Sequence, residues 1–535
     1  MDEVLTSIKN QDDGLNLWGT VEKLPRKDVI AWHDSNHFDF LHHAIIHNNV
    51  IAVGTFLTRG YFKSLQEPNI YPYQHVACLL GFKTILTMLL QERQFDDKSL
   101  HKTDFKQLCR SLRISLSSEI TNYNTDIDFT TPDQLSVLDV ASLAGHIGCV
   151  KTILDFRQLK GYISLKQKGD YFSLACYGNS PNSLKLLLQE KAGDVNLEDS
   201  VKISLVKMHV ECLDCLLSHG ARTESLYSGM NLFHVLYSYV YAFDKEQFKG
   251  LVKMTSLILK HGFDVKACVP SRTYPLYSFI DKYFGREDIE IKGGGILHCL
   301  KLLLEAGADP NFNEVIAENA HQGQHGIFGG AFGREPFSSA FHAFLSHYVQ
   351  SSLKKGEETE YRGLPGFFFK VCQQLLQNGA DPNYRAIFGT PEQEISVFQA
   401  ACLCSMNVEN ENRTIKLFLQ YGGDPNGSGF SIKSLLEWHI RLNALESETE
   451  ELLNMLLGTM SHANYRQSSK EMRDLANMDI FLPNFVQSVN KESITVWTLK
   501  RFCCVFILNS CQRSSMKVNS LPVPENVKKQ IFPFC

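Results

Sequence analysis

The chain has little net charge, no long apolar run and no secretory signal at its start. Its 53 Lys and Arg residues and 58 Asp and Glu residues leave a formal charge of -5, so no basic face for nucleic acid is expected. No segment approaches the roughly 20 apolar residues that a membrane helix needs. The N-terminus also lacks the basic and apolar regions of a signal peptide. These absences predict a protein that binds neither nucleic acid nor membranes.

The 15 cysteines form no disulfide framework of a small domain and no set of metal-binding pairs. Cys212-Leu213-Asp214-Cys215 has the spacing of a metal or redox pair, but it lies in an apolar helical segment without a second pair. Two buried helix cysteines are the favoured interpretation. We therefore expect reduced thiols, no metal and a cytoplasmic protein, with the nucleus as the other compartment that fits.

One pattern recurs along the 535 residues, which are too many for a single compact core. An apolar helix ends at Gly, and Asp-Pro-Asn follows. Gly suits the left-handed position after a helix, and Pro prevents the helix from continuing. Asp or Asn then closes a turn through its own side chain. The clearest copies are residues 300–311, 375–383 and 417–426.

A short helix with small Ala residues lies upstream of such stops, as in residues 40–44, 137–146 and 397–401. The order of short helix, turn, apolar helix, Gly stop and extended turn resembles the ankyrin repeat. The signature of that repeat is degraded here, although Leu41-His42-His43-Ala44 keeps part of it. We expect an all-α solenoid of about ten degenerate ankyrin repeats. An unrelated all-helical solenoid is the alternative.

The distances between successive Gly stops vary, which indicates insertions. The predicted organisation is an N-terminal cap (1–34), ankyrin repeats (35–460) with insertions near 312–335 and 350–366, a connecting helical segment (461–492) and a C-terminal module (493–535).

Leu499, Cys503 and Ile507 in the C-terminal module are spaced four apart, so they form one apolar stripe on a helix. Pro522 cannot lie inside a helix, and Pro524 suits the first turn of the next one. A stripe on the last helix either packs back onto its own domain or docks into another protein.

Residues 493–535 resemble a SOCS box, which implies three helices. Three departures from the family pattern bear on the cullin contact more than on the elongin contact: Cys504 in place of a basic residue, Val523 in place of Leu, and a tail cut short by Pro533. The resemblance implies elongin binding by Thr498, Leu499, Cys503 and Ile507, and cullin binding by Leu521, Pro522 and Pro524.

Together, the array and the module resemble the ankyrin repeat and SOCS box family. That resemblance implies a substrate-recognition subunit of an elongin–cullin–RING E3 ubiquitin ligase. Its partners would be elongin C with elongin B, a cullin-5-type cullin with a RING-box protein, and an unknown protein substrate. It implies no catalytic residue and no cofactor. Two alternatives remain: an ankyrin scaffold whose last helices only cap the repeats, and an enzyme with its site in the insertions.

Three further features have a structural and a functional interpretation. The segment 323–333 is Gly-rich but lacks the Gly-Lys-Ser/Thr ending of a phosphate loop, which favours an insertion. His43 and His47 share a helix face without the Glu of a metalloprotease motif, which favours packing. Asn196 lies in a sequence that resembles an asparaginyl hydroxylase site in ankyrin repeats, and a plain turn residue is the favoured alternative.

Overall fold

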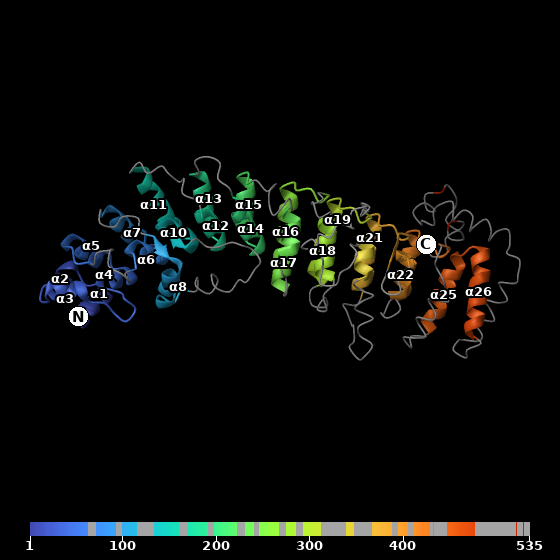
Figure 1. Ribbon diagram of the computed structural model, residues 1–535, viewed down its shortest axis with the longest axis horizontal. Coiled ribbons are helices and arrows are strands. Elements are labelled where there is room, and N and C mark those ends of the chain that lie inside the picture. Colours follow the sequence, from blue (N-terminus) through green and yellow to red (C-terminus); the bar gives the residue numbers. More distant parts are fainter. Residues whose placement is uncertain are drawn as a thin grey trace, which may run out of the picture. The chain divides into compact units, whose positions relative to one another are not determined.

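The structure of the chain, a computed structural model, contains two compact units, Met1–Val235 and Leu236–Cys535. Each consists of helix pairs that stack side by side (Figure 1). The structure describes residues 1–62, 71–92, 99–114, 133–159, 170–190, 197–221, 231–239, 245–266, 274–284, 293–311, 339–346, 366–387, 394–404, 411–427, 432, 447–476, 521 and 528.

In the first unit, each pair has an inner helix followed by an outer helix. The inner helices are α1 (Asp2–Lys9), α4 (Phe40–Ile46), α6 (Tyr73–Leu80), α10 (Val137–Ala144), α12 (Asp170–Tyr177) and α14 (Glu198–Val206). The outer helices are α2 (Gly14–Val21), α5 (Val50–Arg59), α7 (Lys83–Gln91), α11 (Ile147–Leu159), α13 (Pro181–Gln189) and α15 (Val210–Ser218). Inner helices pack on the inner helices of neighbouring pairs, and outer on outer, so two rows form (Figure 1).

The turn inside each pair of the first unit repeats the same hydrogen bonds. After α6, Gly81 N–H donates to the Cys78 carbonyl (3.2 Å), and Phe82 N–H donates to the Ala77 carbonyl (2.9 Å). These two bonds are a Schellman motif, which places one residue of the turn in the left-handed region. The left-handed residues are Gln11, Asn48, Gly81, Gly145, Asn179 and Met208.

The carbonyl that closes this motif belongs to a small, buried residue in each of these pairs. It is Ala in four of them and Ser in the first and last, where it is Ser7 and Ser204. A small side chain here lets the next inner helix approach closely. The four alanines, all fully buried, are Ala44, Ala77, Ala141 and Ala175.

Adjacent pairs are also joined by a side chain at the start of the outer helix. The Asn49 amide donates to the carbonyl of Ile8 at 3.0 Å, and Nε2 of His146 donates to the carbonyl of Leu79 at 3.2 Å. His209 makes the equivalent bond from Nδ1 to the Cys176 carbonyl at 2.7 Å. Each bond reaches a carbonyl at the end of the preceding inner helix, and the carbonyls of Ile8 and Cys176 also accept a backbone N–H of their own turn.

Two other helices belong to the first unit, α3 (Arg26–Ala31) and α8 (Lys102–Ser111). Strand β1 (Leu100–His101) pairs antiparallel with β2 (Gln134–Leu135), so the segment that holds α8 returns to the stack directly before α10. On α8, Phe105 and Leu108 are buried while Asp104 and Gln107 are exposed, as expected of an amphipathic helix.

The second unit repeats the stacking, with a row of successive outer helices α17, α19, α21, α23 and α25. Residues 340–346 are also helical, and α16 contains the boundary of the two units. The elements are α16 (Leu232–Tyr239), α17 (Lys245–Lys260), α18 (Pro275–Phe284), α19 (Gly293–Glu305), α21 (Phe367–Gln377), β3 (Arg385–Ile387), β4 (Glu394–Ser396), α22 (Val397–Cys404), α23 (Glu411–Gln420), α25 (Ser447–Thr459) and α26 (His462–Ala476).

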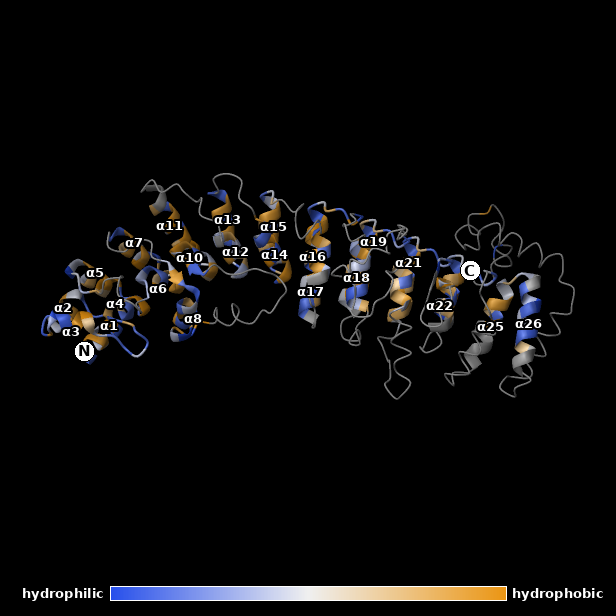
Figure 2. Ribbon diagram, viewed as in Figure 1, coloured by the Kyte–Doolittle hydropathy of each residue, from blue (hydrophilic) through white to orange (hydrophobic). Residues whose placement is uncertain are grey.

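Aromatic rings fill the core of the second unit. The centroids of Tyr237 and Phe279 are 5.1 Å apart, and Phe344 lies 5.4 Å from Phe284 and 5.3 Å from Phe368. Edge-to-face and tilted pairs at these distances are favourable beyond their buried area. Hydrophobic colour accordingly runs along the stacked helices, whereas much of α26 is hydrophilic (Figure 2).

The helical repeat array predicted from the sequence is confirmed for the described residues. Within the segment 1–34, which was predicted to cap the first repeat, α1 and α2 stack on α4 and α5 as the later pairs do. One detail differs: among the described residues, the short hairpins β1–β2 and β3–β4 lie between the helices. The insertion near 312–335 lies outside the described residues. Among the described residues, no helix is both long and apolar enough to cross a membrane.

A substitution at Gly81 tests the close approach of neighbouring pairs. A Cβ at Gly81 (φ +79°) would lie 2.7 Å from His146 Nδ1, whereas one at Gly220 (φ +74°) would meet nothing within 4 Å. We expect Gly220→Ala to cost about 1 kcal/mol for the left-handed backbone. Gly81→Ala should cost about 1 kcal/mol more, because the displaced ring loses its bond to Leu79. Urea unfolding followed by circular dichroism measures both, and equal costs would contradict this packing.

Candidate protein-interaction surface

The side chain of Asn383 joins two successive turns of the second unit. Its Nδ2 donates to the carbonyl of Gly422 (2.8 Å), and its Oδ1 accepts from the backbone N–H of Asp424 (2.7 Å). Both the Nδ2 donor and the Oδ1 acceptor of the amide therefore bond to the backbone of the following turn. Because two bonds fix the amide in one orientation, the spacing of the two turns is fixed as well.

Asn311 repeats this geometry one turn earlier. Its Nδ2 donates to the Gly379 carbonyl and its Oδ1 accepts from the Asp381 N–H, both at 2.6 Å. Asn426 continues one turn later, where its Oδ1 accepts from Ser461 N–H at 2.6 Å. We call Asn311, Asn383 and Asn426 the asparagine ladder.

The ladder ends at the start of α26. Oγ of Ser461 accepts from the backbone N–H of Asn464 (3.3 Å), and the Asn464 amide donates to Oδ1 of Asn426 (3.1 Å). Residues 459–461 thus take the place that Gly and Asp have in the earlier turns, although their sequence is different. The periodic backbone contacts therefore extend to α26.

The aspartates of the same turns act locally. Oδ1 of Asp309, Asp381 and Asp424 each accepts from the backbone N–H two residues on, at 2.8 Å. This is the Asx turn that the sequence predicted for these sites. The sequence did not reveal the second role, in which the asparagine leaves its own turn and contacts the next. The recurrence of Asn after each Asp-Pro was the available signal.

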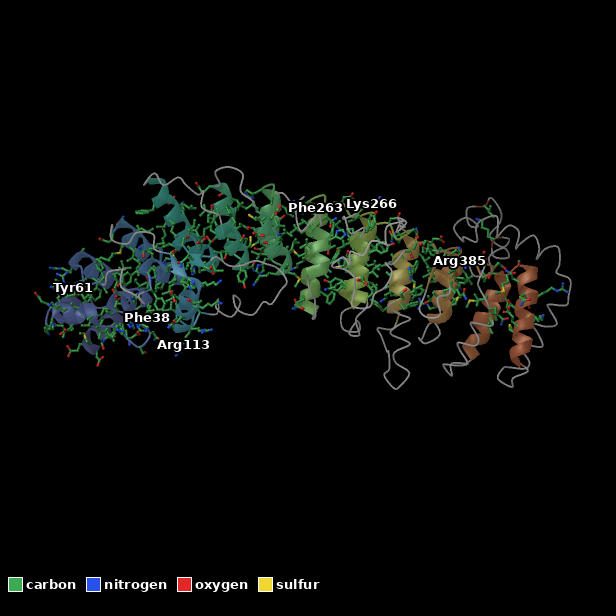
Figure 3. All side chains as sticks on the ribbon, in the orientation of Figure 1. Phe38, Tyr61, Arg113, Phe263, Lys266 and Arg385 are labelled. Carbon is green, nitrogen blue, oxygen red and sulfur yellow. The ribbon has the colours of Figure 1, made fainter. Side chains whose placement is uncertain are left out.

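Lys266 occupies the asparagine position in an earlier turn. Oδ1 of Asp264 accepts from Lys266 N–H at 2.8 Å, so the Asx turn is kept. The Lys266 side chain lies beside Gly307, with Cε 3.6 Å from where a Cβ would stand. Lys266 and Phe263 mark this turn, and Arg385 marks β3, in Figure 3.

Charged side chains project from these turns to solvent. Because the ladder holds the backbone, a partner that binds these side chains meets a surface that is already ordered, which lowers the entropic cost of binding. Both signs of charge are present, which suits a polar protein surface. We define the turn face by its exposed residues Asp264, Lys266, Asp309, Asp381 and Arg385.

His42 is a structural residue in the first unit. Its Nδ1 lies 2.9 Å from Oδ1 of Asp39, and its Nε2 donates to the carbonyl of Tyr71 at 2.9 Å. Tyr73 O–H donates to the second Asp39 oxygen at 2.5 Å. His42, Asp39 and Tyr73 are all buried, so this network joins α4 to the start of α6 and is closed to a substrate.

Burial and neighbouring groups shift the pKa values of Asp39, His43 and His47. Burial alone would raise the pKa of Asp39, but the charge of His42 and hydrogen bonds from His42 and Tyr73 outweigh it and lower that pKa below its ordinary value. Burial lowers the pKa of His43, against the opposing effect of Asp34, and burial also lowers the pKa of His47. The His43 and His47 rings stack at 6.4 Å, as the packing interpretation expected.

The residues expected to bind elongin lie outside the described residues, as do Asn196, Pro522 and Pro524. Of the cullin set, the structure describes Leu521, which is half-buried. Cys212 is buried, as expected, but Cys215 is half-exposed. In the described part of the chain, no group of three or more His, Cys, Asp or Glu side chains could hold a metal ion.

No protein-family model and no curated protein matches the chain. Among solved structures, it is similar to the ankyrin repeat domain of Bcl-3, a member of the IkappaB family, at 16% identity and TM-score 0.30, covering 44% of this chain and 91% of that one. It is also similar to the human ASB11 ankyrin repeat domain at 16% identity and TM-score 0.29, covering 55% and 100% respectively. What the structure itself shows is stacked helix pairs joined by repeated turns.

Removal of the Asn383 amide tests the ladder. Asn383→Ala leaves the Gly422 carbonyl and the Asp424 N–H without this partner, so we expect a loss of about 1–2 kcal/mol and faster hydrogen exchange at Asp424. The control is Asn378→Ala, because that amide donates to the Gln374 carbonyl of the helix it ends (2.8 Å). Exchange at Asp424 that is equally fast in both variants would contradict the ladder.

Acid should destabilise the first unit in two steps. A lowered histidine pKa stabilises the fold fully above the unfolded value near 6.5, and this contribution is lost as pH falls below it. A lowered Asp39 pKa stabilises above about 4 and is lost below that pH. Urea midpoints between pH 3 and 8 measure both. His43→Gln should reduce the upper step and Asp39→Asn the lower one.

Proposed function

We propose that this chain is a non-catalytic substrate-recognition subunit of an elongin–cullin–RING ubiquitin ligase. The array would hold a protein substrate, and the C-terminal module would recruit elongin C with elongin B. A cullin-5-type cullin and its RING-box protein would then bind this complex. The observation that carries the proposal is the stripe Leu499, Cys503 and Ile507 with Leu521-Pro522-Val523-Pro524 after it, at the end of a repeat array.

The turn face supports the recognition half of the proposal. Its charged side chains stand on turns whose backbone is held by the asparagine ladder. A solenoid of such turns offers an extended surface instead of a deep pocket, which suits a folded protein better than a small molecule. We assign the substrate contact to this face.

The stripe supports the recruitment half. Leu499 would fill an apolar pocket on elongin C, and Cys503 would pack one turn further on, where a bulkier side chain would clash. Leu521 and the two prolines that follow it would contact the cullin. The chain itself would perform no reaction. It would raise the effective concentration of a substrate lysine near the ubiquitin-conjugating enzyme.

The second candidate is an ankyrin scaffold whose last helices only cap the repeats. The contacts of Ser461 and Asn464 with Asn426 favour it in one respect, because they give the array an ordered end at α26 without the C-terminal module. The two candidates differ in whether elongin C binds.

Co-purification of the full chain with elongin B and elongin C separates the two candidates. Leu499→Pro breaks the stripe, so elongin capture should fall at least tenfold. Lys500→Ala is the matched control, because Lys500 lies beside Leu499 but off the stripe, and its capture should stay at the wild-type level. Wild-type capture by Leu499→Pro would contradict the proposed function.

A further variant separates the two halves of the module. Pro522→Ala with Pro524→Ala should keep elongin capture and lose the cullin. Loss of both partners would instead indicate that the module folds as one unit.

A further inference from the structure

Two arginines of the first unit lie over the faces of two aromatic rings. The guanidinium carbon of Arg59 is 4.6 Å from the centre of the Trp18 ring, and that of Arg26 is 5.1 Å from the centre of the Tyr61 ring. The two rings meet edge to face, with centroids 5.3 Å apart. The side chains come from α2, α3, α5 and the chain just after α5, so separate elements build one site. Tyr61 is labelled in Figure 3.

The two guanidinium groups are held in place and remain available. Nη2 of Arg26 donates to the carbonyl of Gly60 at 3.1 Å, which holds Arg26 against the end of α5. Arg59 lies in the last turn of α5, where the partial negative charge of the helix favours a cation. Both arginines are exposed, and among the residues that the structure describes neither forms an ion pair with a carboxylate. They therefore keep N–H groups that an acceptor from another molecule can bind.

An exposed apolar surface adjoins the arginines. Leu15 is 84% exposed and Ile51 is 53% exposed. A Cβ at Gly14 would lie 3.2 Å from Cγ2 of Ile51, so the start of α2 lies against the start of α5. Leu15 and Trp18 are three residues apart on α2, and Ile51 and Arg59 are eight apart on α5, so each pair shares a helix face. Each face therefore leads from an apolar end to an arginine end.

We propose that the first unit binds an acidic segment of a partner protein on the surface formed by Leu15, Trp18, Arg26, Ile51, Arg59 and Tyr61. We call it the arginine–aromatic surface. Carboxylates of the segment bind the two guanidinium groups, and an apolar side chain of the segment contacts Leu15 and Ile51. A planar guanidinium offers a carboxylate two parallel N–H donors, and its ring contact orients it before binding. This proposal does not depend on the proposed ligase function.

The spacing of the surface defines the segment. Ile51 and Arg59 are eight residues apart, which is about 12 Å along a helix. An extended peptide covers this distance in about four residues. Because Arg26 and Arg59 contact different rings, two acidic residues should be bound instead of one. The segment should therefore carry a large apolar residue followed about four residues later by a pair of Asp or Glu residues.

The neighbouring charges favour a short acidic segment over a polyanion. Asp13 caps α2 by accepting from the N–H groups of Leu15 (3.0 Å) and Asn16 (2.8 Å), and Glu22 ends the same helix. Both carboxylates are exposed. A nucleic acid or an anionic membrane spreads its charge over an area larger than this site and would be repelled by both. A segment of a few residues can bind the arginines and avoid them.

Fluorescence anisotropy of the full chain with labelled peptides tests the proposal. The probe has one Leu followed four residues later by two consecutive Glu, with Gly and Ser elsewhere, and we expect saturable binding. Exchange of both Glu for Gln should weaken binding about tenfold, because the charge-assisted hydrogen bonds are lost. Exchange of the Leu for Ala should also weaken it. Equal binding of the Glu and Gln peptides, or no saturable binding, would overturn the proposal. So would tighter binding to single-stranded DNA or to phosphatidylserine vesicles.

Variants of the chain make the test specific. Arg26→Gln and Arg59→Gln should each weaken the Glu peptide about tenfold and leave the Gln peptide unchanged. Leu15→Ser should weaken both peptides, and the exposure of Leu15 means that the fold is kept. Lys27→Gln is the matched control, because it removes an exposed positive charge next to Arg26 on α3. Equal weakening by Lys27→Gln and Arg26→Gln would contradict a specific site. Elongin capture should stay at the wild-type level in all four, so the two proposals fail separately.

Discussion

A single helix pair of this array cannot bury its apolar face alone, so the structure depends on the contacts between neighbouring pairs. We call the side-chain hydrogen bonds that join one pair to the next locks. In the first unit, the lock is a side chain at the start of an outer helix, such as His146 or Asn49, which donates to a carbonyl of the preceding pair. In the second unit, it is the asparagine ladder. Both locks use side chains to satisfy backbone groups at chain turns, where a helix leaves donors and acceptors unpaired. Because each contact joins only neighbours, the loss of one lock should weaken an interface and leave distant pairs intact.

The sequence predicted those parts of the fold that a residue type enforces. Gly before Asp-Pro-Asn specifies the helix stop, and Asp381 closes its turn as expected. The left-handed turn inside the pairs was harder to recognise, because Met208 and Asn179 occupy it as well as Gly. A left-handed residue costs roughly 1–2 kcal/mol, which packing between pairs can offset, so Gly is not required there. The first helix pair, in the segment predicted as a cap, has Gln11 at this left-handed position.

The ladder could not be predicted from spacing. Asn311 and Asp381 are 70 residues apart and Asn383 and Asp424 are 41 apart, because chain segments of different length lie between them. The amide also contacts backbone atoms, so the residue types of the following turn need not be kept. Ser461 shows this directly, since it takes the place of an aspartate and still donates its N–H to Asn426. A repeat array can therefore lose its sequence signature while it keeps its hydrogen bonds.

Because the hydrogen bonds between turns are kept while the residue types change, such a chain could keep the geometry that a receptor needs. A substrate receptor must hold its two ends at a distance and angle that place a substrate lysine near the conjugating enzyme. The locks of the second unit use backbone groups and asparagine amides. Three residues of the turn face, Asp264, Asp309 and Asp381, also close their own Asx turns through Oδ1. At these positions one carboxylate would serve both the stiffness of the turn and the binding of a partner, so a change of binding residue there would also loosen the turn.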